Sequence, residues 1–141
     1  MRVFLDANIL FSAAKSDGAV RRLLELLLAR GHACWVDGYV VEEARRNLAA
    51  KFPEGVSALE RQLALLHVSR AHPRARDPDL AVGLPVPEKD RAVLAAAIHL
   101  GCEALVTGDR SHFGALYRQT IRGVAIHSPR SLAESVLGRD S

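Results

Sequence analysis

Short runs of apolar residues recur along the chain, and longer segments in which apolar and polar positions alternate with helical spacing lie between them. Short runs that are apolar at every position are typical of strands buried on both faces of a parallel sheet. Strands are therefore expected at residues 3–5, 33–36, 104–107 and 124–126, with a weaker candidate at 67–70.

The segments between these runs have the apolar spacing of amphipathic helices. Val20, Leu24 and Leu27 fall on one helical face, for example, and Gly31 then supplies a stop signal. Residues 71–87 hold four prolines and little periodicity, which predicts a surface loop. Helices are expected at residues 8–14, 19–30, 38–52, 53–66, 88–100, 111–117 and 129–137.

Strands that alternate with helices predict an α/β fold, a three-layer α/β/α sandwich with a short, mainly parallel central sheet. The length of 141 residues suits one domain, so residues 1–141 are expected to form a single unit. In open sheets of this kind, the functional crevice lies beyond the carboxyl ends of the strands. Asp6 and Asp109 each closely follow a predicted strand, so the pattern places both at that edge.

Two further acids complete a candidate cluster with Asp6 and Asp109: Glu43 after the second strand, and Asp90 near a predicted helix start. Each acid also has a purely structural explanation. Asp6 and Asp90 suit helix N-termini, Asp109 suits a turn, and Glu43 can be one of many solvated helix charges. Their joint placement favours a site. Glu42 competes with Glu43, because neighbouring helix residues point about 100° apart.

Carboxylates that share a small crevice repel one another strongly, and a divalent cation resolves that repulsion. Hard oxygen ligands suit Mg²⁺ or Mn²⁺. Such an ion can activate water and offset the charge of a scissile phosphate, so no serine, cysteine or histidine nucleophile is required. The cluster therefore predicts metal-dependent hydrolysis of a phosphodiester.

The composition, with 49% apolar and 25% charged residues, is that of a folded globular protein. A net charge of +3 permits a polyanionic partner without demanding one. Cys34 and Cys102 lie in apolar surroundings and are expected to be reduced core thiols of a cytoplasmic protein. Asp6 interrupts the first apolar run, so no signal peptide is expected, and no apolar stretch is long enough for a membrane span.

The histidines do not have the spacing of a zinc site. His112 follows Asp109 closely, but its position is more typical of a surface helix residue. Among the arginines, Arg91 and Arg110 are the best candidates to contact an RNA backbone, because each adjoins a proposed acidic residue. The other arginines considered for such a path are Arg45, Arg46, Arg70, Arg74 and Arg76.

Four segments around the acids together resemble the PIN-domain family, the fold of many prokaryotic toxin ribonucleases such as the VapC group. They are residues 3–10, 40–48, 90–98 and 104–113, and the likeness extends over nearly the whole chain. The family pattern places its acidic helix residue five positions before a leucine. That spacing matches Glu43 with Leu48 and leaves Glu42 as second choice.

The resemblance implies divalent-metal binding and catalysis by Asp6, Glu43, Asp90 and Asp109. Asn8 and Thr107 match polar positions that line the pocket in similar proteins. The implied activity is endonucleolytic cleavage of single-stranded RNA, by the toxin of a toxin–antitoxin pair or a solitary relative. Similar proteins often form homodimers, and a small antitoxin protein silences the toxins among them.

Three alternatives remain at this stage. A catalytically silent module could bind RNA or protein through the same groove. A magnesium phosphatase could form an aspartyl-phosphate at Asp6, although Asn8 stands where an acidic proton donor would be expected. A DNA-flap nuclease is a third candidate, but the chain is short for the DNA-gripping elements of that class.

Overall fold

The computed structural model of the chain describes residues 1–70 and 86–138. In this part of the chain, six strands form one sheet with the order β3-β2-β1-β4-β6-β5. The strands are β1 (Arg2–Leu5), β2 (Ala33–Asp37), β3 (His67–Ser69), β4 (Ala104–Val106), β5 (Thr120–Ile121) and β6 (Val124–His127).

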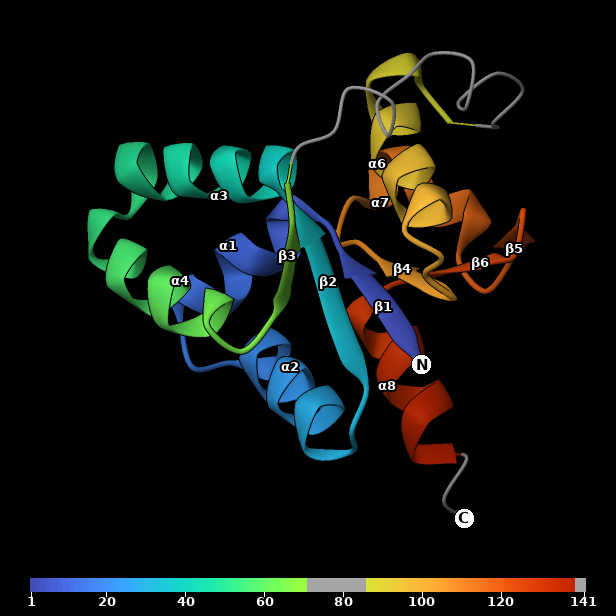
Figure 1. The fold of residues 1–141 in the computed structure, drawn as a ribbon, viewed down its shortest axis with the longest axis horizontal. Coiled ribbons are helices and arrows are strands. Elements are labelled where there is room, and N and C mark those ends of the chain that lie inside the picture. Colours follow the sequence, from blue (N-terminus) through green and yellow to red (C-terminus); the bar gives the residue numbers. More distant parts are fainter. Residues whose placement is uncertain (71–85, 139–141) are drawn as a thin grey trace.

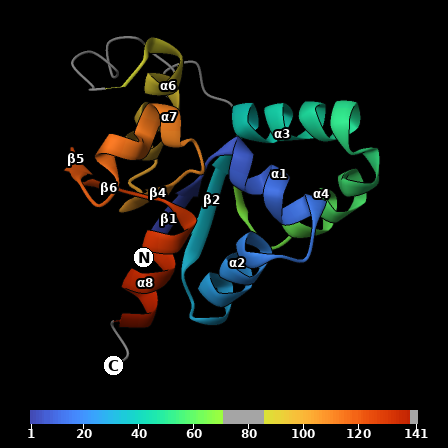
Figure 2. The same ribbon diagram turned by 180° about the vertical axis from the view of Figure 1, so that it is seen from behind.

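Helices cover both faces of this sheet. Helices α1 to α4 lie on one side of β1 and β2, whereas α6 and α7 lie on the other, and the two views agree on this arrangement (Figures 1 and 2). Helix α8 packs against α2 and β6. The helices are α1 (Ala7–Lys15), α2 (Ala19–Ala29), α3 (Gly38–Lys51), α4 (Val56–Leu63), α6 (Glu88–His99), α7 (Arg110–Phe113) and α8 (Pro129–Gly138), with short 3₁₀ turns at Pro53–Gly55 and Gly114–Leu116.

Strand β1 lies inside the sheet and has further strands on both of its sides. It pairs in parallel with β2 through Val3 and Cys34, and in parallel with β4 through Val3 and Ala104. The chain therefore leaves β1 toward β2 and β3, and later returns to add β4 and β6 on the opposite side. The carboxyl ends of β1 and β4 meet at this reversal, where open α/β sheets form their binding crevices. The predicted three-layer fold with a mainly parallel sheet is confirmed.

Strand β5 is the element that the sequence pattern did not predict. It pairs antiparallel with β6 across a two-residue turn, in which Arg122 and Gly123 have φ values of 50° and 85°. Positive φ at both central residues is the geometry of a tight hairpin turn. Because β5 spans only Thr120–Ile121, it is too short to show an alternation of apolar and polar positions.

The predicted loop at residues 71–87 falls, up to residue 85, outside the described residues, together with Arg74 and Arg76. Among the described residues, no helix has both the length and the apolar content that a bilayer crossing requires.

Both cysteines are buried in the core as free thiols, as the sequence predicted. Cys34 lies on β2, and Cys102 precedes β4. Burial raises the pKa of the Cys34 thiol to about 12 and that of Cys102 to about 11. A thiol with a raised pKa is protonated and poorly nucleophilic at neutral pH.

We expect both thiols to resist labelling by a disulfide reagent such as DTNB in the native protein at pH 8. Their raised pKa values alone reduce the thiolate concentration by more than about 100-fold relative to an exposed cysteine, and by more for Cys34 than for Cys102. Absorbance-detected labelling in buffer and in urea would measure this difference. Rapid labelling of either cysteine without denaturant would contradict the placement of these residues.

Candidate functional site

Asp6 lies in the connection between β1 and α1 and is 7% exposed. Its Oδ1 accepts a hydrogen bond from the backbone N–H of Ala7 at 2.8 Å. Its Oδ2 accepts from the hydroxyl of Thr107 at 2.8 Å and from the side-chain amide of Asn8 at 3.3 Å. Asp6 therefore caps α1, as the structural explanation proposed, and both of its oxygens are also held at the edge of the sheet.

The loop after β4 is tied to this carboxylate through Thr107. The Thr107 hydroxyl, besides donating to Asp6, accepts from the backbone N–H of Asp109 at 3.2 Å. Asn8 fastens the same loop, because its Oδ1 accepts from the backbone N–H of Gly108 at 2.8 Å. Thr107 was expected to line the pocket, but it is fully buried and its hydroxyl is directed to Asp6.

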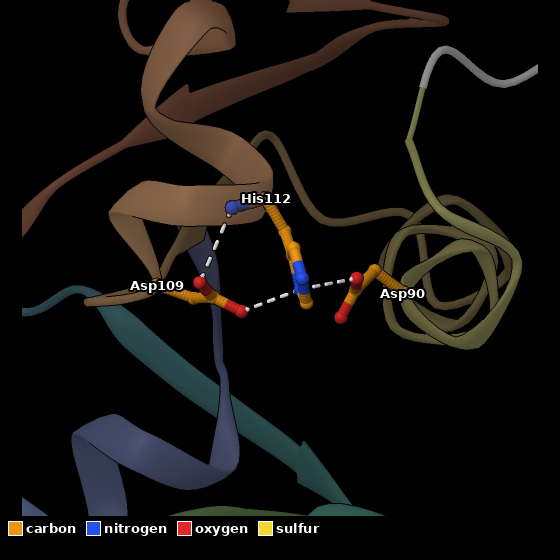
Figure 3. Close-up of side chains that lie close together, drawn as sticks. All are labelled: Asp90, Asp109 and His112. Atoms are coloured by element: carbon orange, nitrogen blue, oxygen red, sulfur yellow. Dashed lines mark hydrogen bonds and ion pairs between the residues drawn. The ribbon is translucent and has the colours of Figure 1, made fainter.

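Asp90 and Asp109 converge on one atom of His112 (Figure 3). The imidazole Nδ1 lies 2.7 Å from Oδ2 of Asp90 and 2.9 Å from Oδ2 of Asp109. One ring nitrogen carries at most one proton, so it cannot donate a full hydrogen bond to both carboxylates. The prediction that His112 is an ordinary surface residue is wrong, because it is half-buried between the two acids.

Asp109 also shapes the start of α7. Its Oδ1 accepts from the hydroxyl of Ser111 at 2.8 Å and from the backbone N–H of His112 at 3.2 Å. These bonds orient the carboxylate so that Oδ2 is left to face the imidazole Nδ1 of His112. The spacing of three residues between Asp109 and His112 was the sequence signal that could have revealed this contact.

Helix α3 brings a fourth acid to the same place. Glu43 lines a cleft of about 360 Å³, whereas Glu42 is outside the lining and lies 3.8 Å from Arg45 at the surface. Of the two glutamates, Glu43 is therefore the one that lines the cleft, and its role as a metal ligand stays a prediction. The residues that line the cleft are Asp6, Ala7, Asn8, Phe11, Glu43, Asn47, Lys51, Asp90, Val93 and Asp109.

Crowding of negative charge alters the ionisation of Asp6. Burial is the largest cause that raises the pKa of its carboxyl group, and the charges of Glu43 and Asp90 raise it further. The hydrogen bonds from Thr107 and Ala7 act in the opposite direction and stabilise the ionised form. Burial and charge repulsion prevail, so the cluster is electrostatically unfavourable when it lacks a cation.

The donor set fits a divalent metal ion. One ligand atom from each of Asp90, Asp109 and His112 can be chosen so that all lie within 4.8 Å of one another. Carboxylate oxygens are the donors that Mg²⁺ and Mn²⁺ prefer, and an imidazole nitrogen is a donor that transition metals accept more readily than Mg²⁺ does. The histidine is the donor that sequence reasoning did not include.

The two arginines that were the best candidates to contact an RNA backbone lie outside the acidic cleft. Arg91 donates from Nε to the backbone oxygen of Val86 at 3.1 Å, and Arg110 lines a second cavity of about 510 Å³ with Tyr117 and Arg130. Neither Arg91 nor Arg110 lines the acidic cleft. The polar and aromatic residues that do line it, and that the sequence did not single out, are Phe11, Asn47 and Lys51.

Comparisons with known proteins agree with this architecture. A family model described as PIN domain matches residues 2–111. No curated protein sequence matches the chain. A structure of VapBC2 from Rickettsia felis, bound to a DNA fragment from their promoter, is 19% identical over 91% of this chain and 98% of that chain, with a TM-score of 0.67.

Two further solved structures are similar. VapBC-1 from nontypeable Haemophilus influenzae is 14% identical over 92% of this chain and 99% of that chain, with a TM-score of 0.64. VapC20 from Mycobacterium tuberculosis, a sarcin-ricin loop cleaving toxin, is 15% identical over 77% of this chain and 92% of that chain, with a TM-score of 0.51. At these identities, the likeness shows a shared fold.

The charge repulsion generates a prediction for Glu43→Gln. Because the pKa of Asp6 is raised in the folded protein, Asp6 supports stability fully below its ordinary pKa and loses that contribution as the pH rises through the raised value. Removing the Glu43 charge should therefore raise the melting temperature of the metal-free protein at pH 7 by about 1–2 °C. This gain should shrink at acidic pH.

Glu42→Gln is the matched control, because it removes the same charge one residue away and outside the cleft. Thermal melts of both variants in EDTA across pH would separate a local effect from a change in net charge. Equal melting temperatures for the two variants at pH 7 would contradict the repulsion.

The hydroxyl of Thr107 generates a second prediction. Thr107→Val keeps the shape of the side chain but removes the donor to Asp6 and the acceptor for the Asp109 N–H. We expect a loss of about 2 kcal/mol in the free energy of unfolding, measured in urea. Thr120→Val, at an exposed position on β5, should change it by less than about 0.5 kcal/mol. Parent-like stability of Thr107→Val would contradict the linking role.

Proposed function

This chain belongs to the PIN domain family, and on that premise we propose that it is a single-domain, divalent-metal-dependent endoribonuclease that cleaves single-stranded RNA. The observation that carries the proposal is the meeting of four acids in one cleft of about 360 Å³. They come from four separate parts of the sequence and are Asp6, Glu43, Asp90 and Asp109.

These four acids would hold Mg²⁺ or Mn²⁺, with His112 as an additional donor between Asp90 and Asp109. When bound, a divalent cation supplies Lewis acidity for the activation of water and positive charge to offset that of a scissile phosphate. The raised pKa of Asp6 supports this proposal, because a cation in the cleft favours the ionised carboxylate that burial and repulsion disfavour.

The residues of the chain prepare the site before substrate arrives. Hydrogen bonds to both oxygens of Asp6 fix the orientation of its carboxylate, and Asn8 holds the loop that carries Asp109. Ser111 and the N–H of His112 fix Asp109 in the same way. Preorganised groups need no rearrangement during reaction, which is the usual source of electrostatic catalysis.

Covalent mechanisms have less support from the geometry. Cys34 and Cys102 are buried with raised pKa values, so neither offers a reactive thiolate at the cleft. An aspartyl-phosphate at Asp6 would require attack by a carboxylate that is 7% exposed and accepts hydrogen bonds at both oxygens. Failure to trap phosphorylated Asp6 with a phosphate-ester substrate would exclude that phosphatase mechanism.

We further propose a cytoplasmic toxin of a toxin–antitoxin pair, or a solitary relative, that forms a homodimer and binds an antitoxin protein. Two of the similar structures are VapBC assemblies, and a third is a sarcin-ricin loop cleaving toxin. The shared fold supports this part of the proposal at the level of architecture. The catalytically silent binding module remains the second candidate, and the cleavage assay decides between the two.

We expect the parent protein to cleave single-stranded RNA in Mn²⁺ or Mg²⁺ and to lose cleavage in excess EDTA. Asp6→Asn and Asp109→Asn should each reduce the rate by at least about 100-fold, because each removes a charged ligand from the cluster. Glu42→Gln, outside the cleft, is the control that should cleave like the parent.

The readout is the cleavage rate of labelled RNAs of varied sequence, resolved on denaturing gels. Parent-like cleavage by both aspartate variants would overturn the proposed mechanism. Binding of RNA by the parent without cleavage in either metal would favour the silent module.

A further inference from the structure

We propose that the part of the cleft between α1 and α3 is a nucleotide subsite, in which the Phe11 ring stacks on an RNA base and Lys51 binds an adjacent phosphate. This inference rests on the proposed function and extends it, since it concerns how a single strand is held beside the acidic cluster. Besides the four acids, Phe11, Asn47 and Lys51 line this cleft.

Three residues at regular intervals on helix α3 form part of the cleft wall. Glu43, Asn47 and Lys51 are each four residues apart and line the same cleft. At a rise of about 1.5 Å per residue, Lys51 lies about 12 Å along the helix axis from Glu43. The backbone positions of Glu43 and Lys51 on α3 are thus well separated along the cleft wall, with Asn47 between them.

Lys51 has the character of a phosphate-binding group. It is exposed, and no ion pair or hydrogen bond involves its side chain within residues 1–70 and 86–138. Arg45 on the same helix is different, because Glu60 pairs with it at 2.8 Å. A lysine at the last turn of a helix complements the macrodipole, but that effect does not require it to line an acidic cleft.

Phe11 is the phenylalanine that forms part of the cleft wall. Phe4 and Phe113 are fully buried in the core, and Phe52 is half-buried, as Phe11 is, but does not line the cleft. The Lys15 ammonium group lies 6.0 Å from the centroid of the Phe11 ring and adds positive charge beside it. Every nucleobase has a π-face, so an aromatic ring in a groove binds single-stranded RNA with little sequence preference. A duplex would not present an unstacked base to it.

Asn47 lies between Glu43 and Lys51 on α3, with its side chain half-buried and without a hydrogen-bond partner in the described part of the chain. An amide donates and accepts, so it can pair with the polar edge of a base. The whole cleft, including the part lined by the four acids, has a volume of about 360 Å³, which is in the range of pockets for small ligands.

The test measures RNA binding separately from cleavage. Fluorescence anisotropy of a fluorescein-labelled oligouridine is recorded in Ca²⁺, a hard cation that takes oxygen ligands, with gels to verify that the RNA stays intact. Lys51→Gln and Arg46→Gln form a matched pair, since each removes one positive charge from α3. Arg46 is exposed and does not line the cleft.

We expect Lys51→Gln to weaken binding by about 5- to 10-fold and to reduce the salt dependence of log Kd by about 0.7. Arg46→Gln should change Kd by less than about 2-fold. Phe11→Leu, which keeps an apolar side chain, should weaken binding by about 5-fold without changing the salt dependence. Melting curves verify that each variant is folded. If Phe11→Leu is unstable, Lys51→Gln still tests the subsite, because Lys51 is exposed.

Equal weakening by Lys51→Gln and Arg46→Gln, or unchanged binding in both Lys51→Gln and Phe11→Leu, would overturn the subsite. Its failure is distinguishable from failure of the proposed function. If the parent protein cleaves RNA while these variants bind it normally, the proposed nuclease function stands and the proposed subsite is wrong. If the parent binds RNA through Lys51 and Phe11 but never cleaves it, the proposed subsite stands and the proposed nuclease function is wrong.

Discussion

The hydrogen bond from the Thr107 hydroxyl to Asp6 joins the two strands on which the site depends. Parallel pairing of Leu5 with Val106 brings the ends of β1 and β4 to one edge of the sheet, and this 2.8 Å contact fixes the residues that follow them. Burial raises the pKa of the Asp6 carboxyl group, and the hydrogen bond from Thr107 offsets only part of that shift. The fold thus holds a carboxylate ready in a place where its charge is costly, and a cation removes that cost.

The same electrostatics explain how a polyanion can enter an acidic cleft. Four carboxylates repel an RNA strand as they repel one another, although the chain as a whole has a net charge of +3. Under the proposed function, two features would oppose this repulsion: a divalent cation at the acids, and Lys51, which lines the same cleft. Metal binding and substrate binding are therefore expected to be coupled, because each positive group lowers the barrier that the strand meets.

Much of this site could be predicted from the sequence, since Asp6 and Asp109 follow apolar strands and parallel strands end at one edge. Periodicity alone could not choose between Glu42 and Glu43, because the choice depends on how α3 is rotated against α1 and neither glutamate belongs to the apolar stripe. The family resemblance favoured Glu43 through its spacing to Leu48. His112 and Lys51 look like ordinary surface residues in a linear pattern. Only tertiary packing places His112 between Asp90 and Asp109, and Lys51 among the residues that line the cleft.

Anomalous diffraction from crystals grown with Mn²⁺ is the most direct test of a shared cation site. The predicted result is a manganese peak inside the cleft between α1, α3 and α6. The peak should lie within coordination distance of Asp109 and of at least one of Asp90 and Asp6. Crystals of Asp109→Asn under the same conditions should show a weaker peak or none. A cleft without manganese at saturating metal, or a peak only at unrelated surface carboxylates, would contradict the shared site.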